Sequence, residues 1–189
     1  MPQLHIYREN DIPPDIECQA VSFLRVHWPW TFSGENRLNR HMWRGWNPAP
    51  FVVEQERVLI SYAVVIETTL DHAGETYETL GLSSVFTYPP FRGEGHGRRV
   101  VDAATRCIRE SEADVAVLWC EPGLEGFYGE SGWVATRESE TLIGTRKEPR
   151  LKDEPDHPST RMMFFLSEKG KAGRTAFGRQ PLFVGKHTW

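Results

Sequence analysis

A glycine-rich segment, Phe91-Arg92-Gly93-Glu94-Gly95-His96-Gly97-Arg98-Arg99, constrains the fold of this chain more than any other feature. Two prolines, Pro89 and Pro90, stand before it and must end the preceding strand, because proline has no backbone N–H to donate to a sheet. Apolar residues with helical spacing follow it: Val100, Val101, Ala104, Cys107 and Ile108. The segment therefore predicts a turn that links a strand to an amphipathic helix beginning near Gly97.

Such a turn can bind an anion. Glycines let backbone N–H groups approach an oxyanion closely, and a helix N-terminus offers unpaired donors and a favourable dipole for phosphate. Arg92, His96 and Arg98 add positive charge nearby. A P-loop would need Gly-Lys followed by Ser or Thr, and a dinucleotide fingerprint would space its glycines as GxGxxG, so both are excluded. A glycine-rich turn that only joins two elements is the alternative.

Three stretches before this turn are rich in Val, Ile, Thr and Tyr and are separated by short polar turns. They cover residues 51–54, 58–69 and 75–87, and they predict three consecutive antiparallel strands. After the helix, residues 114–120 predict a buried strand and residues 124–131 a short helix. The fold class is therefore α/β (α+β), with a mixed and mostly antiparallel sheet flanked by helices in a single domain of residues 1–189.

The two ends of the chain are less regular. Leu4 and Ile6 predict a first strand, and residues 11–15 predict the entry to a helix that continues to His27. Residues 28–50 hold several tryptophans and prolines without a sustained period, and they predict a loop region on the substrate side. Residues 133–143 and 161–166 predict two closing strands. The charged stretch 147–158 between them predicts a solvated loop, and residues 167–189 show no clear period.

The composition of the chain limits the kinds of partner that we expect it to bind. No apolar run reaches the roughly 18 to 20 residues that a membrane span needs, and no basic stretch followed by an apolar one opens the chain. Three widely spaced cysteines suit a reducing compartment better than a disulfide framework or a zinc site. The net charge of −4 argues against a nucleic-acid surface. We therefore expect a cytoplasmic protein with no membrane, nucleic-acid or metal partner.

Motifs along the middle of the chain follow one another in a recognisable order. Val85 and Pro90 precede Arg92-x-x-Gly95-x-Gly97, and after a helix come the apolar run 115–118 and Gly126-Phe127-Tyr128-Gly129-Glu130-Ser131-Gly132-Trp133. This order, across residues 58–133, resembles the GNAT superfamily of N-acetyltransferases. The resemblance implies acetyl-CoA as co-substrate, a core at about 51–135, and a strand that splays from its neighbour at the acetyl-CoA site.

The resemblance also assigns roles by position. The backbone of Val85, Phe86 and Thr87 would hold the pantetheine arm and polarise the thioester carbonyl. Tyr128 would protonate the leaving thiolate, and a phenol with a pKa of about 10 is a suitable donor to a thiolate of comparable basicity; an aromatic side chain that only packs is the alternative. The loop residues would bind the pyrophosphate: Arg92, Gly93, Glu94, Gly95, His96, Gly97 and Arg98.

The amine half of the reaction needs a base, because a protonated amine cannot attack a thioester. Glu121 directly follows an apolar strand, where a splayed sheet would open, so it is the first candidate for a base or an amine-anchoring carboxylate. A solvated carboxylate before a Pro-Gly turn is the alternative. Glu67 and His72 are runners-up. Ser83 and Ser84 are expected to face opposite sides of their strand, so that one of them would reach the substrate.

Part of the chain is similar to the aminoglycoside 2'-N-acetyltransferases. The likeness rests on residues 81–87, the hairpin 63–77 and the terminal Trp189, which would line the substrate cleft. Those enzymes carry a glutamate on the strand before the loop and an aspartate before the last tryptophan, where this chain has Ser83 and His187. Loss of two carboxylates would weaken recognition of a polycation, so an aminoglycoside is one substrate option among others.

Three functions fit these observations. The first is an N-acetyltransferase that acts on a primary amine of a small molecule, which the tryptophan-rich residues 28–46 favour because they can wall an aromatic pocket. The second is acetylation of a protein or peptide amine. The third is an acyl-CoA-binding sensor without catalysis. The resemblance leaves a homodimer open, and no metal is required.

Overall fold

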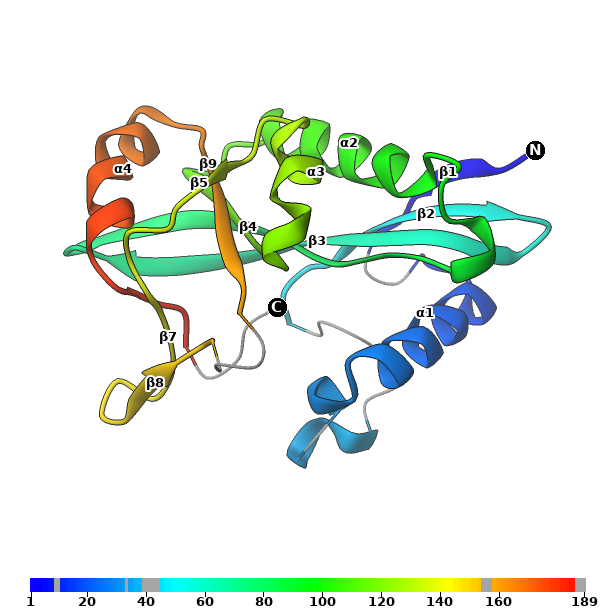
Figure 1. Ribbon diagram of the computed structural model, residues 1–189, viewed down its shortest axis with the longest axis horizontal. Coiled ribbons are helices and arrows are strands. Elements are labelled where there is room, and N and C mark those ends of the chain that lie inside the picture. The colour runs from blue at the N-terminus through cyan, green and yellow to red at the C-terminus, as the bar shows by residue number, and fades with distance from the viewer. Residues whose placement is uncertain (9–10, 33, 39–44, 154–157, 186–189) are drawn as a thin grey trace. The chain divides into compact units, whose positions relative to one another are not determined.

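The computed structural model describes residues 1–8, 11–32, 34–38, 45–153 and 158–185 (Figure 1). Its contacts cluster into two compact units, one made of Met1–Ile66 and Ser84–Ala104, the other of Glu67–Ser83 and Thr105–Trp189. The boundary falls within two strands and one helix, so these elements contribute residues to both units.

Antiparallel strands form the sheet of the first unit. Strand β1 (Gln3–Ile6) pairs with β2 (Ala49–Gln55), and β2 pairs with β3 (Val58–His72). Glu56 and Arg57 turn the chain between β2 and β3 with φ of 52° and 64°, which is the left-handed backbone that a two-residue hairpin needs. The predicted strands at 51–54 and 58–69 are therefore confirmed, each somewhat longer than expected.

Helix α1 (Pro14–His27) is the predicted first helix, and Phe23 on it stacks on Phe86 of the sheet. Pro14 opens it, and Asp15 and Glu17 in its first turn complement the helix dipole. The buried face carries Ile16, Ala20, Val21, Phe23 and Leu24. Two 3₁₀ turns follow it, Pro29–Phe32 and Gly34–Leu38.

The strand, turn and helix predicted around the glycines are confirmed. Strand β4 (Glu75–Thr87) ends before the 3₁₀ turn Pro89–Phe91, and helix α2 (His96–Arg109) begins one residue earlier than expected. Within the first unit, Val100, Val101 and Ala104 of α2 are fully buried.

Both parallel and antiparallel pairs occur in the second unit. Strand β5 (Val115–Cys120) pairs parallel with β4 and antiparallel with β9 (Thr160–Phe165). Strand β6 (Val134–Ala135) pairs antiparallel with β9. A second sheet contains β10 (Leu182–Phe183), β7 (Thr141–Gly144) and β8 (Pro149–Leu151), in that order. The fold class is thus the predicted one, mixed α/β with mostly antiparallel strand pairs.

Two predictions for this unit were wrong in part, and a third stretch had no structure assigned to it. The stretch 133–143 is not one strand but two, β6 and β7, with an interruption between them. The expected loop 147–158 contains β8, whose residues pair with β7. The stretch 167–189, which showed no period, contains helix α4 (Glu168–Arg179). The short helix expected at 124–131 is α3 (Glu125–Gly129), and the 3₁₀ turn Pro122–Leu124 precedes it.

The buried side chain of Arg161 links the segment between β6 and β7 to the end of α4. The side chain of Arg161 on β9 is 3% exposed, and it donates hydrogen bonds only to neutral oxygens among the described residues. Its acceptors are the hydroxyls of Thr136, Ser139 and Thr141 and the carbonyl oxygens of Glu140 and Phe177. Burial lowers the pKa of Arg161 to about 10. The guanidinium therefore holds the segment between β6 and β7 against the end of α4.

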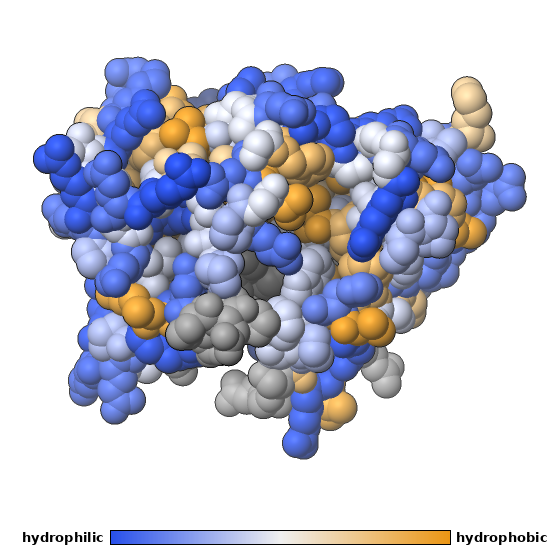
Figure 2. Space-filling view, in the orientation of Figure 1, coloured by the Kyte–Doolittle hydropathy of each residue, from blue (hydrophilic) through white to orange (hydrophobic). Residues whose placement is uncertain are grey.

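Surface residues are mixed in character. The face drawn in Figure 2 is largely hydrophilic, with apolar residues interspersed. Exposed apolar side chains of the chain include Val26, Trp30, Leu38 and Leu124. None of the described helices is both long and apolar enough to cross a membrane.

Candidate functional site

The glycines of the loop before α2 adopt a backbone that other residues avoid. Gly93 and Gly95 have φ of 83° and 81°, in the left-handed region. A Cβ atom added to either one would meet nothing within 4 Å, so conformation and not crowding explains glycine there. Left-handed residues in such a turn direct successive N–H groups to one side, and the first turn of α2 adds N–H groups that have no partner within the helix. The loop thus has the backbone of an anion site.

The charged residues around the loop also favour a bound anion, with one exception. The first turn of α2 carries Arg98 and Arg99 and no acidic residue, although cations oppose the positive end of the helix dipole. A bound anion would offset that cost. Arg98 Nη1 lies 3.9 Å from Asp102 Oδ1 one turn further on. Glu94 is the exception, because its Oε2 lies 3.2 Å from His96 Nε2 and brings a negative charge into the loop.

The last residues of β4 are fixed by hydrogen bonds. Ser61 Oγ donates to the carbonyl oxygen of Phe86 at 2.8 Å, and it also shares a 2.9 Å hydrogen bond with Thr87 Oγ1. Arg92 Nε donates to the carbonyl oxygen of Thr87 at 3.0 Å, which ties the glycine loop to the end of the strand. The half-buried Val85 precedes these residues. The segment from Val85 to Thr87 is therefore a rigid stretch of backbone next to the loop.

Further back, β4 departs from a regular strand. Ser84 has φ of 52°, so the strict alternation of faces that the sequence predicted for Ser83 and Ser84 is interrupted. Ser83 is buried and Ser84 is half-buried. In the second unit the parallel pairing of β4 with β5 covers Thr79 to Gly81, and it stops there although both strands are longer. Within the second unit the pairing of the two strands therefore ends after Gly81, close to where the family resemblance implied a splay.

Tyr128 lies on α3 and is 6% exposed. The ring of Phe127 packs edge-on against it, with centroids 5.0 Å apart. Burial raises the pKa of Tyr128 well above its usual value, and the charges of Cys120 and Glu121 raise it further. The phenol is thus a weaker acid than the sequence suggested. It keeps its proton at any physiological pH and can act as a hydrogen-bond donor.

Glu121 stands at the carboxyl end of β5, beside both Cys120 and Tyr128. Its side chain is exposed, and its charge raises the pKa of both neighbours, so the structure brings the predicted acid and the predicted base or anchor together. Burial and Glu121 raise the pKa of Cys120 to about 11. A thiol that holds its proton this firmly is a poor nucleophile.

The other predicted residues fall elsewhere. His72 is buried and stacks on the ring of Phe177 at 4.4 Å, and burial lowers its pKa. It also lines a surface pocket at the turn between β3 and β4, together with Asp71 and Arg146. Glu67 is exposed on β3. Trp189 and His187 lie outside the described residues.

Comparison with known proteins supports the resemblance seen in the motifs. A family model described as an acetyltransferase (GNAT) domain matches residues 6–135. No match was found among curated proteins. The chain is similar to the solved structure of the Escherichia coli GNAT family N-acetyltransferase YhbS in complex with CoA, with 16% identity, a TM-score of 0.62, and coverage of 97% of this chain and 89% of that one.

Two further solved structures are similar over most of their length. Escherichia coli ElaA shares 14% identity with a TM-score of 0.62, over 86% of this chain and 99% of that one. An acyl-CoA N-acyltransferase from Pseudomonas aeruginosa shares 15% identity with a TM-score of 0.58, over 86% and 99%. At these identities the structures show the fold, and the family model shows the family. The model spans the glycine loop, the end of β4 and Tyr128, and the chain therefore belongs to the GNAT family of acetyltransferases.

Proposed function

We propose that this protein transfers the acetyl group of acetyl-CoA directly to a primary amine of a small molecule. The observation that carries the proposal is the pair of left-handed glycines, Gly93 and Gly95, at the N-terminus of α2 in a chain of this family. The backbone N–H groups from Gly93 to Gly97 and the side chains of Arg92 and Arg98 would hold the pyrophosphate, since charge-assisted hydrogen bonds to phosphate are strong.

The end of β4 would place the thioester. Val85, Phe86 and Thr87 present backbone groups beside the loop, and the contacts from Ser61 and Arg92 keep this backbone in one position. A reacting group held in one place loses little entropy when the amine arrives, which accelerates the reaction. These residues are the ones that we assign to the pantetheine arm.

The transfer needs three proton movements. The ammonium first loses a proton, for which Glu121 or a water beside it is our candidate acceptor. The amine nitrogen then attacks the thioester carbon and gives up a second proton to the same acceptor, which has released the first proton to solvent, and the C–S bond breaks. The departing sulfur takes a proton from Tyr128, which solvent restores. The raised pKa of Tyr128 keeps the phenol protonated, so it can donate a hydrogen bond to the departing sulfur, while complete transfer of the proton is less favourable than for an ordinary phenol.

A coupled thiol-release assay tests the proposal against its two alternatives. Acetyl-CoA is mixed with the protein and with small monoamines, an aminoglycoside, or peptides that carry a free N-terminus or lysine. Release of CoA with small amines supports the proposal. Release with peptides alone would make the protein a peptide or protein acetyltransferase. Saturable binding of acetyl-CoA with no release for any acceptor would make it a sensor.

A further inference from the structure

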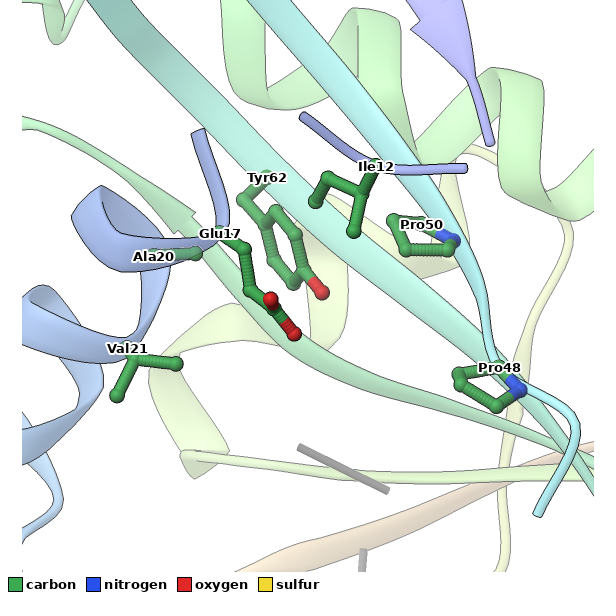
Figure 3. Close-up of a pocket in the computed structure, with 7 residues that line it drawn as sticks. All are labelled: Ile12, Glu17, Ala20, Val21, Pro48, Pro50 and Tyr62. Atoms are coloured by element: carbon green, nitrogen blue, oxygen red, sulfur yellow. The ribbon is translucent and has the colours of Figure 1, made fainter. Parts of the chain in front are cut away.

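The pocket drawn in Figure 3 is too small for an acceptor amine with its chain. It lies between α1 and strands β2 and β3, and its volume of about 20 Å³ leaves room for one group the size of a water molecule. In Figure 3 the carboxylate of Glu17 and the phenol oxygen of Tyr62 lie at one end of it. Ile12, Pro48 and Pro50 line the rest together with α1. The pocket therefore belongs to the packing of α1 on the sheet of the first unit.

Helix α3 in the second unit carries Tyr128, the proposed acid, and has only 5 residues. A helix this short is not stable by itself, so contacts with its neighbours decide where Tyr128 lies. Glu125 is its first residue and makes such contacts in two directions. Its carboxylate accepts a hydrogen bond from Thr160 Oγ1 at 2.5 Å and hydrogen bonds from the guanidinium of Arg137. Glu125 thus ties the start of α3 to β9 and to the segment between β6 and β7.

The contact between Glu125 and Thr160 lies next to the proposed acid and base. Thr160 is the first residue of β9 and pairs with Cys120, the last residue of β5. The charges of Cys120 and Glu121 raise the pKa of Tyr128, so these three groups are near one another. Thr160 is 7% exposed and the side chain of Glu125 is 18% exposed, so water weakens their hydrogen bond little.

Glu125 and Tyr128 are also neighbours on the surface of α3, because residues three positions apart in a helix lie on the same side of it. The chain beyond the other end of the helix is held separately, since Arg109 Nη2 donates a hydrogen bond to the carbonyl oxygen of Ser131 at 2.9 Å. Loss of the carboxylate contacts would let the first turn of α3 move, and the phenol with it. A displacement of about 1 Å at a reacting group can slow a reaction by about 100-fold.

We propose that Glu125 is a positioning residue, which holds the phenol of Tyr128 where it can donate to the departing sulfur of acetyl-CoA. The proposal rests on the acetyl transfer proposed above, with Tyr128 as its acid. Glu125 takes no proton in this role and stays paired with Thr160 and Arg137 throughout. Substitution of Glu125 would therefore change the rate of the transfer and not its products.

Single-turnover thiol release in a double-mutant cycle tests this role. In protein saturated with acetyl-CoA, Glu125→Gln should slow release by about 10- to 100-fold, because the amide keeps the size of the side chain and loses the charge that both partners bind. In a Tyr128→Phe background the same substitution should change the rate by less than about twofold, since the group that Glu125 positions is gone. The affinity for CoA, measured by calorimetry, should not change, because Glu125 is not among the residues that we assign to CoA.

Variants of Thr160 test the same contact from β9. Thr160→Val keeps the shape of the side chain and removes the hydroxyl, so it should slow release in the same direction as Glu125→Gln. Thr160→Ser keeps the hydroxyl and should restore the rate. Glu168→Gln is the matched control, because it is the same change at the first residue of α4, where the side chain pairs with Lys171. It should release thiol at the wild-type rate, and circular dichroism checks that every variant is folded.

Equal slowing by Glu125→Gln with and without Tyr128 would overturn the proposal, because Glu125 would then act independently of the acid. A wild-type rate in Glu125→Gln would also overturn it, as would a wild-type rate in Thr160→Val if Glu125→Gln does not fold. Failure of the proposed transfer has a different signature. The wild type would then release no thiol with any amine, or Tyr128→Phe would keep the full rate, and no acid would remain for Glu125 to position.

Discussion

Substitution of Gly95 by alanine isolates the contribution of the loop backbone to CoA binding. Gly95 has φ of 81°, and a left-handed backbone costs an ordinary L-residue about 1–2 kcal/mol. No atom lies within 4 Å of the added Cβ, so the cost comes from the backbone and not from a clash. Because the loop is exposed, we expect its backbone to relax to another conformation in the free variant. Binding of CoA would then require the left-handed conformation again, and the free energy of binding would be weaker by this amount. A cost of this size corresponds to a factor of about 5–30 in affinity.

Isothermal titration calorimetry with CoA measures the effect. The dissociation constant of Gly95→Ala should rise by that factor while the melting temperature stays close to that of the wild type. Gly178→Ala is the matched control, because Gly178 on α4 has no neighbour within 4 Å of an added Cβ and no left-handed φ. Its affinity for CoA should not change. An unchanged affinity in Gly95→Ala would refute the assignment of the loop to the pyrophosphate.

Three predictions concern the stability of the second unit. Burial lowers the pKa of His72 below its usual 6.5, so below that pH the unfolded chain binds more protons than the folded chain. The free energy of unfolding, measured by urea denaturation, should therefore fall as the pH drops below about 6.5. The fall should be smaller in His72→Gln. Arg161→Met leaves buried oxygens without donors and should lower the free energy of unfolding by at least about 2 kcal/mol in the same assay; no loss would contradict the role of this side chain. Gly170→Ala places a Cβ against the carbonyl oxygen of Asp114 and should cost about 1–3 kcal/mol, whereas an unchanged midpoint would show that α4 can shift freely.

Much of the fold around the glycine loop could be predicted because its signals are local. Prolines end the preceding strand, glycines permit the turn, and the buried residues of α2 recur with helical spacing. Strands β3 and β4 are rich in β-branched residues, and Ala73 and Gly74 between them have φ of 51° and 86°, the hairpin backbone of one of the short polar turns that the sequence predicted. These features need no knowledge of distant contacts.

Helix α4 escaped prediction because two positions of its buried face are glycines. Gly170, Gly173 and Phe177 face inward, so the face shows almost no apolar period in the sequence. The one local signal was Ser167, whose Oγ accepts a hydrogen bond from the N–H of Gly170 at 3.0 Å and caps the helix. The glycines are explained only by the close approach of Asp114 and Tyr77, which are far away in the sequence.

Some features of the candidate site could likewise be predicted from the sequence, and others could not. The loop could be found from glycine spacing, and Tyr128 from its place in a motif. The raised pKa of Tyr128 could not be predicted, because it depends on burial and on the charges of Cys120 and Glu121 in the folded chain. The contacts of Glu125 were missed because α3, β9 and the segment after β6 meet only in the folded chain.

Single-turnover thiol release tests the proposed transfer most directly. Wild-type protein saturated with acetyl-CoA is mixed with the best amine of the panel, and CoA is followed under conditions where chemistry limits the rate. We expect Tyr128→Phe to slow release by about 100-fold or more, the usual contribution of a general acid. Tyr77→Phe, the same change at a tyrosine packed against α4, should keep the wild-type rate. Full activity in Tyr128→Phe, or no release by the wild type with any amine, would contradict the account.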